Sequence, residues 1–195
     1  MKKLLSFALL FSFVAFNLSA REPEEIIKDI FAKAGKENLL NNKQAKDEVE
    51  SYVDFGEMTK TILKDELSKR SATDIKWFET TIKDIITRSV YPSAPKFLEG
   101  VKITFKKTQN VGENVKVQSS INKKGEITSV DYVMKKINGD WRVVDVAIDD
   151  ESWVSTINEK VAKTLKDKGW NGLKDLLNKR LKELKSGKKV AKAKE

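Results

Sequence analysis

The spacing of apolar residues changes twice along the chain and divides it into three parts. Between residues 23 and 99, apolar side chains recur three and four positions apart, which is typical of one face of an α-helix. Between residues 101 and 148 they alternate with polar ones, as in a half-buried strand. Helical spacing returns at Val154 and continues to Leu184. The pattern therefore predicts helices, then strands, then helices.

Four helices and a short fifth piece are predicted in the first part, and local signals mark several of their ends. Pro23 suits the first turn of a helix. Ser71 and Asp74 form a capping box ahead of the longest apolar stripe, which Pro92 and Pro95 interrupt before the short piece. The apolar positions of the four helices are Ile26, Ile27, Ile30 and Phe31; Val49, Tyr52 and Val53; Phe55, Met58, Ile62 and Leu63; and Ile75, Phe78, Ile82, Ile85 and Ile86.

Four strands follow, and the connections between them are short. Asn138-Gly139 is a strong two-residue turn signal, and such connections leave no room for crossover helices, so the strands must be antiparallel. Gly169 separates two final helices. The strand positions are Val101, Ile103 and Phe105; Val115 and Val117; Val130, Tyr132 and Met134; and Trp141, Val143, Val144, Val146 and Ile148. We therefore predict an α+β fold in which a curved, four-stranded antiparallel sheet packs against several helices.

The two ends of the chain do not fit this domain. Residues 1–20 combine two lysines, an apolar run of 13 residues and a small residue before a charged chain, which is typical of a cleaved secretory signal peptide. The run is shorter than the roughly 20 residues that span a bilayer as a helix. Residues 186–195 are rich in lysine and almost free of apolar residues. We expect one domain over residues 21–185, followed by a basic, disordered tail.

The composition excludes several classes of enzyme. The 195 residues include no Cys and no His, so a Ser-His-Asp triad, a cysteine nucleophile, an ordinary zinc site and disulfides are impossible. The net charge of +9 comes largely from the tail and so does not indicate a nucleic-acid-binding surface.

Carboxylates remain as candidates for chemistry, and four of them cluster near the end of the last strand. Asp145, Asp149, Asp150 and Glu151 could form an acid–base pair or hold a hard cation. Alternatively, Asp149 or Asp150 caps the next helix while the others are solvated. We favour the capping role because the glycine of a metal-binding loop is missing. We expect no catalytic residue, no metal site and no cofactor.

The last strand carries apolar residues on both faces, with Val144, Val146 and Ile148 on one and Trp141 and Val143 on the other. Composition alone does not distinguish a filled core from an apolar ligand cavity.

Several motifs resemble the MlaC family, also called the toluene-tolerance family. The resemblance covers roughly residues 23–184. Its motifs are Val53-Asp54-Phe55-Gly56-Glu57-Met58, Ser71-Ala72-Thr73-Asp74 with Trp77-Phe78, Gly139-Asp140-Trp141-Arg142-Val143-Val144-Asp145-Val146, and Gly169 with Gly172-Leu173. The chain departs from the family at Lys64, where a glycine is usual, and at Tyr91, one place late for the family's aromatic. It also has Thr156-Ile157-Asn158 in place of an Asn-Tyr-Arg triplet, so that triplet's contacts are not carried over.

The resemblance implies a periplasmic, monomeric carrier of phospholipid. Its partners would be an outer-membrane lipoprotein complex and an inner-membrane ABC transporter complex. We expect the acyl chains to lie between the concave face of the sheet and the helices that cover it. The expected lipid-binding residues are Met58, Ile62, Phe78, Ile82, Ile86, Phe105, Val117, Tyr132, Met134, Val144, Val154 and Ile157. We expect Arg88 and Tyr91 to meet the headgroup near solvent.

Three alternatives stay open. The same fold could dock proteins and hold no lipid, or it could be a hydrolase that uses Asp145 or Asp149. The lysine-rich tail either contacts an anionic membrane surface or is simply solvated.

Overall fold

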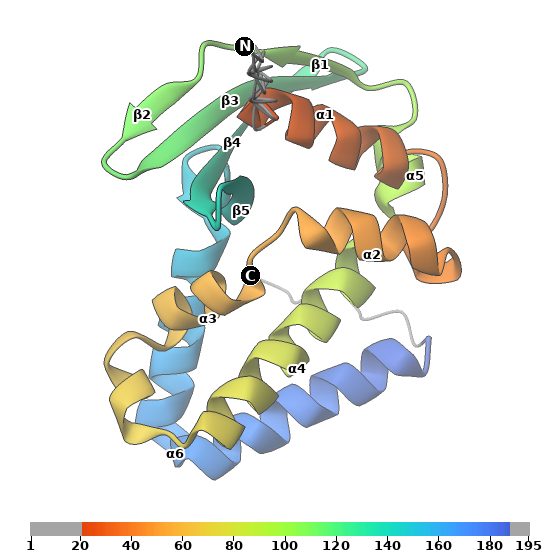
Figure 1. The fold of residues 1–195 in the computed structure, drawn as a ribbon. Coiled ribbons are helices and arrows are strands. Elements are labelled where there is room, and N and C mark those ends of the chain that lie inside the picture. Colours follow the sequence, from red (N-terminus) through yellow and green to blue (C-terminus); the bar gives the residue numbers. More distant parts are fainter. Residues whose placement is uncertain (1–20, 188–195) are drawn as a thin grey trace, which may run out of the picture.

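The computed structural model describes residues 21–187, so the predicted signal peptide and most of the predicted tail lie outside the described residues. Five helices and two 3₁₀ turns precede the strands: α1 (Pro23–Ala34), η1 (Leu39–Asn41), α2 (Lys43–Ser51), α3 (Phe55–Leu63), η2 (Lys64–Lys69), α4 (Ala72–Val90) and α5 (Ala94–Leu98). The strands are β1 (Lys102–Phe105), β2 (Gln109–Val111), β3 (Asn114–Lys123), β4 (Glu126–Ile137), β5 (Asp140–Ile148) and β6 (Glu151–Ser152). A long helix, α6 (Trp153–Lys185), follows them (Figure 1).

All of the described strands form one antiparallel sheet, which confirms the predicted α+β class. The order is β1-β3-β4-β5-β6, with β2 also paired to β3. The sheet has six strands, so the predicted number of four was wrong. The two strands that were missed, β2 and β6, have three and two residues, which is too short for an alternating pattern to be recognised.

A β-bulge in β5 changes which side chains face the helices. Met134 pairs with Val143, but the preceding Val133 pairs with Asp145, so Val144 is an extra residue in β5. Tyr132 and Met134 lie two positions apart and share a face of the sheet. Val143 therefore lies on that face, where simple alternation had placed Val144.

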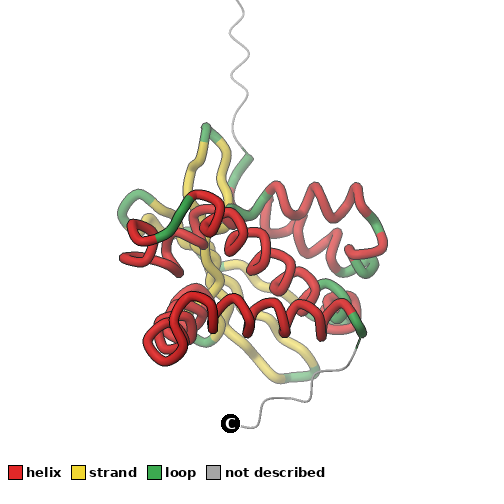
Figure 2. Tube along the Cα trace, turned by 90° about the horizontal axis from the view of Figure 1, so that it is seen from below, coloured by secondary structure: helices red, strands yellow, loops and turns green. Residues whose placement is uncertain are grey.

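The helices lie on one side of the sheet in two groups. Helix α1 lies along the sheet with α2 and α5 beside it, while α3, α4 and α6 pack on one another as a second group, of which α3 and α6 also contact β5 (Figure 1). Viewed from below, these helices lie in front of the strands (Figure 2). Their apolar faces and the inner face of the sheet bury one large cluster, which includes Ile27, Ile62, Phe78 and Val117.

Local signals explain several helix ends. Ser71 caps α4 as predicted, since its Oγ accepts a hydrogen bond of 3.1 Å from the backbone N–H of Asp74. Gly169 has φ 64° and ψ −172°, so the backbone of α6 is not helical there, and the prediction of a break at this glycine is confirmed. Helix α2 ends at Ser51, earlier than predicted, because Val53 instead forms a bridge with Val143 of β5.

Candidate functional site

A cavity of about 650 Å³ lies between the inner face of the sheet and the helices. Helices α1, α3, α4, α5 and α6 and strands β3, β4 and β5 all contribute to its wall. The apolar wall residues contributed by the helices include Ile27, Ile30, Phe31, Met58, Ile62, Ile86, Val90, Leu98, Val154 and Ile157. Those contributed by the sheet are Ile121, Val130, Tyr132, Val143, Val146 and Ile148. An interior of this kind favours an apolar ligand.

Among residues 21–187, no Lys or Arg lines the cavity, and the two charged residues of its wall are Asp145 and Asp149. Asp145 is fully engaged at the start of α6, where its carboxylate accepts hydrogen bonds from Ser152 Oγ at 2.5 Å and from the backbone N–H of Val154 at 3.1 Å. It also accepts one from its neighbour Val146 at 2.8 Å. The interior therefore offers no cation to an anionic ligand, and any charged part of a ligand must stay near the opening.

The exposed members of the wall mark this opening. They are Ser89 and Ser93 near the end of α4, Phe97 on α5, Asp149 after β5, and Trp153 at the start of α6. Phe97 is 52% exposed and Trp153 is 37% exposed. Two exposed aromatic rings, one from α5 and one from α6, thus lie at the mouth.

Comparison with known proteins identifies the family. The family model described as MlaC protein matches residues 23–179. The chain belongs to the MlaC family. Among solved structures, it is similar to the phospholipid-binding protein from Ralstonia solanacearum, determined in complex with a phospholipid. The two share 20% sequence identity over 83% of this chain and 96% of that chain, with a TM-score of 0.71. No curated protein sequence matches.

The match to the Ralstonia structure shows that the two proteins share a fold. Within residues 21–187, none of the helices of this MlaC-family chain is both long enough and apolar enough to cross a membrane.

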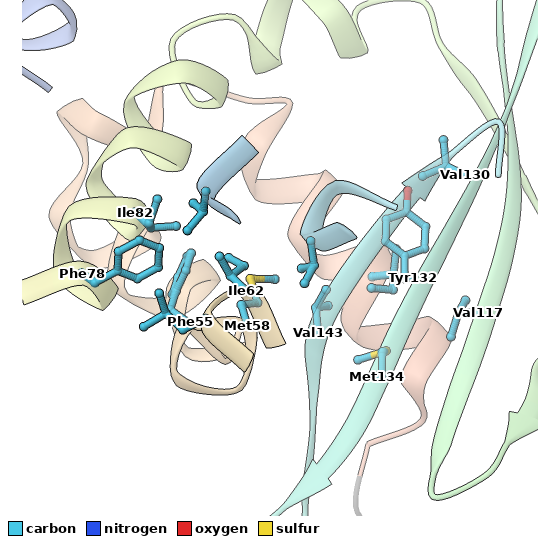
Figure 3. Packing of buried hydrophobic residues seen from close by; sticks show 14 of the residues in the cluster. Phe55, Met58, Ile62, Phe78, Ile82, Val117, Val130, Tyr132, Met134 and Val143 are labelled. Carbon is cyan, nitrogen blue, oxygen red and sulfur yellow. The ribbon is translucent and has the colours of Figure 1, made fainter. Parts of the chain in front are cut away.

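Six of the twelve expected lipid-binding residues line the cavity. They are Met58, Ile62, Ile86, Tyr132, Val154 and Ile157. In Figure 3, Met58 and Ile62 on the helical side lie across from Val143 and Tyr132 on the sheet. Two separate predictions, the apolar helix stripe and the alternating strand, therefore lead to the two walls of one cavity.

The other six expected residues lie outside the wall. Phe78 and Ile82 pack within the helical group, where the ring of Phe78 lies 6.2 Å from that of Trp170. The bulge removes Val144 from the wall and brings in Val143. Of the three other sheet residues that are not in the wall, Val117 and Met134 are buried in the core cluster, and the half-buried Phe105 packs against it.

The expected headgroup residues lie at different depths. Tyr91 belongs to the wall but is only 8% exposed, and its burial raises the pKa of its hydroxyl group. Arg88 is half-buried and does not line the cavity. Neither residue is among the exposed members of the wall that mark the mouth.

Contrary to the prediction, the acidic residues that follow β5 do not cap the next helix. Ser152 caps α6, accepting a 3.0 Å hydrogen bond from the N–H of Ser155, so neither Asp149 nor Asp150 is the N-cap. Asp149 and Asp150 instead form a turn with φ 48° and 67°. Over residues 21–187, the acidic side chains form no group of three that could hold a metal ion.

Several wall residues were missed from the sequence. The stripe Ile27, Ile30 and Phe31 on α1 was recognised as a helix face but not as part of a ligand site. Trp153 and Phe97 gave only the weak signal of an aromatic residue beside a helix end.

Proposed function

We propose that this chain binds the acyl chains of a phospholipid in the cavity and carries the lipid through the periplasm. The observation that carries the proposal is the apolar cavity, whose wall has no cation among residues 21–187 and whose exposed edge carries the aromatic rings of Phe97 and Trp153. Membership of the MlaC family supports it, as does the shared fold with a protein that was solved with a bound phospholipid.

The energetics of lipid transfer explain why such a cavity is needed. Each methylene group moved out of water gains about 0.8 kcal/mol, so two acyl chains of ordinary length amount to roughly 20 kcal/mol. Free diffusion of the lipid through water is therefore negligible. A carrier whose interior resembles hydrocarbon makes transfer to and from a bilayer nearly neutral.

The family suggests the two ends of the route. We infer that the carrier exchanges lipid with an outer-membrane lipoprotein complex on one side and an inner-membrane ABC transporter complex on the other. Neither step needs a catalytic group, which agrees with a sequence without His or Cys. The half-buried acidic residue of the wall, Asp145, is held by Ser152 and the start of α6, which favours a structural role over catalysis.

Filling the cavity tests the proposal. Val146 lines the cavity, whereas Val133 lies on the opposite face of the neighbouring strand and does not. We expect Val146→Trp to lower the amount of phospholipid that co-purifies with the protein severalfold, and Val133→Trp to leave it unchanged. Organic extraction followed by mass spectrometry measures the lipid per protein.

Two results would contradict the proposal. Wild-type protein without phospholipid would favour a docking module of the same fold that holds no lipid. Equal lipid in both folded variants would show that the lipid lies elsewhere.

A further inference from the structure

A negative and a positive side chain lie near the mouth of the cavity, and their charges affect which phospholipid headgroup can bind there. The side formed by the end of β5 and the start of α6 carries Asp149 and the exposed ring of Trp153. The side formed by α5 carries Phe97 with the ammonium group of Lys123 above its ring. A headgroup at the mouth therefore lies near the carboxylate of Asp149, which lines the cavity, and near the cation above the ring of Phe97.

The carboxylate of Asp149 is held in place by the backbone. Its N–H donates to the carbonyl of Ser129 at 2.9 Å, and its Oδ1 accepts from the N–H of Ser129 at 3.0 Å. The residue has φ 48°, a conformation that Asn and Asp tolerate better than most residues. Because one carboxylate oxygen is held by β4, the side chain of Asp149 does not rotate freely, and its negative charge stays at the exposed rim.

The ammonium group of Lys123 is also held in place. Among residues 21–187, Lys123 forms no salt bridge with an acidic side chain; its Nζ donates instead to the carbonyls of Lys96, at 2.9 Å, and of Phe97, at 2.5 Å. An ammonium group has three N–H donors, so one remains for a further acceptor. A phosphate oxygen is an acceptor that this position suits.

We propose that the mouth selects phospholipids whose headgroup carries an ammonium group, with Asp149 facing the ammonium and Lys123 facing the phosphate. The inference rests on the proposed function and names the lipid class that the cavity takes. A zwitterionic headgroup such as ethanolamine offers a partner to both charges. An anionic headgroup such as glycerol leaves Asp149 without a cation and places it near a net negative lipid.

The test compares the two headgroups on identical acyl chains. The mature protein is exchanged against detergent micelles that contain equal amounts of phosphatidylethanolamine and phosphatidylglycerol, re-isolated, and its lipid measured by mass spectrometry. We expect wild-type protein to favour the ethanolamine lipid. Asp149→Asn keeps the acceptor for Ser129 and the tolerated backbone conformation, and should reduce the ethanolamine-to-glycerol ratio about two- to fivefold, the range of an exposed ion pair.

Two further variants separate the contributions. Asp140→Asn removes an exposed carboxylate at the opposite end of β5 and should leave the ratio unchanged. Lys123→Gln should lower the uptake of both lipids without changing their ratio, because both carry the phosphate. In wild-type protein, raising the ionic strength should lower the ratio because salt screens exposed charges, a measurement that needs no variant.

The outcomes distinguish this inference from the proposed function. Wild-type protein that takes up neither lipid would overturn the proposed function itself. Normal uptake with the same ratio in wild type and Asp149→Asn, or an equal fall in Asp140→Asn, would overturn the headgroup preference alone. Unchanged uptake in Lys123→Gln would reject the role of that lysine.

Discussion

Lys64 adopts a backbone conformation that normally belongs to glycine. Its φ is 45° and its ψ is −118°, directly after the last residue of α3. The carbonyl of Ile62, in the last turn of α3, accepts a 2.6 Å hydrogen bond from the side-chain amide of Asn158 on α6. This hydrogen bond holds the end of α3 against α6, although the backbone of Lys64, which turns the chain there, is strained. This is also the position at which the MlaC family usually has glycine.

Replacing this lysine by glycine should stabilise the fold. A strained backbone position costs of order 1–3 kcal/mol, while the greater freedom of glycine in the unfolded chain costs about 0.5–1 kcal/mol. We therefore expect Lys64→Gly to raise the free energy of unfolding by about 1 kcal/mol in urea titrations. Lys60→Gly, inside α3, should lower it by about 1 kcal/mol. A Lys64→Gly variant no more stable than wild type would show that the position is not strained.

Asp74 should make stability depend on pH in the acid range. Its carboxylate accepts hydrogen bonds from Lys174 Nζ at 2.5 Å, Ser71 Oγ at 2.9 Å and Trp170 Nε1 at 3.2 Å, which lower its pKa from 3.8 to about 2. Because this pKa is lower in the folded state, the stabilisation is complete above pH 4 and is lost as the pH falls towards 2.

The pH dependence can be assigned to this residue by substitution. We expect Asp74→Asn to be less stable than wild type at pH 6 and to show a shallower loss of stability between pH 4 and pH 2, followed by thermal unfolding. Asp175→Asn, at an exposed site on α6, is the matched control and should keep the wild-type slope. Parallel curves for Asp74→Asn and wild type would contradict the assignment.

At the scale of elements, α6 depends on two glycines near its middle. The non-helical backbone at Gly169 is followed by a close approach between Gly172 and Lys168, since a Cβ on Gly172 would collide with the Cβ of Lys168. We expect Gly172→Ala to destabilise the protein by about 1–3 kcal/mol, as overpacking does.

A double substitution tests whether the contact with Lys168 causes this loss of stability. Lys168→Gly removes the atom that a Cβ at position 172 would meet, so Gly172→Ala should cost less free energy of unfolding in that background than in wild type. Equal costs in both backgrounds would point to another cause.

Most strands and most helix ends could be predicted from the sequence. Alternation identified β1, β3, β4 and β5, and the caps and glycines identified most helix ends, because these signals are local. The bulge at Val144 and the two-residue strand β6 were missed because both depend on pairing between strands. For the site, periodicity predicted which side chains face the helices. It did not predict that Val130 borders the cavity while Val117 lies in filled core, because the gap depends on how the helices are placed.

At the scale of the whole molecule, the sheet and the outer helices enclose space that their own side chains do not fill. Cavity walls lose the contacts that a filled core would make, so an empty cavity lowers stability relative to a filled one. A ligand that binds only the folded state adds RT ln(1 + [L]/Kd), which is about 2.7 kcal/mol at one hundred times Kd. Lipid occupancy should therefore be visible in the unfolding of the entire domain.

We expect delipidated protein to unfold at a lower temperature than loaded protein, by about 5–10 °C for a domain of this size. In Val146→Trp the indole occupies part of the cavity, so lipid should no longer raise the unfolding temperature, whereas Val133→Trp on the opposite face should show the full increase. Calorimetry of each variant with and without added phospholipid measures the difference. If lipid raised the unfolding temperature of Val146→Trp as much as that of wild type, its stabilising contacts would lie outside the cavity, and the space between the sheet and the helices would be no more than a packing defect.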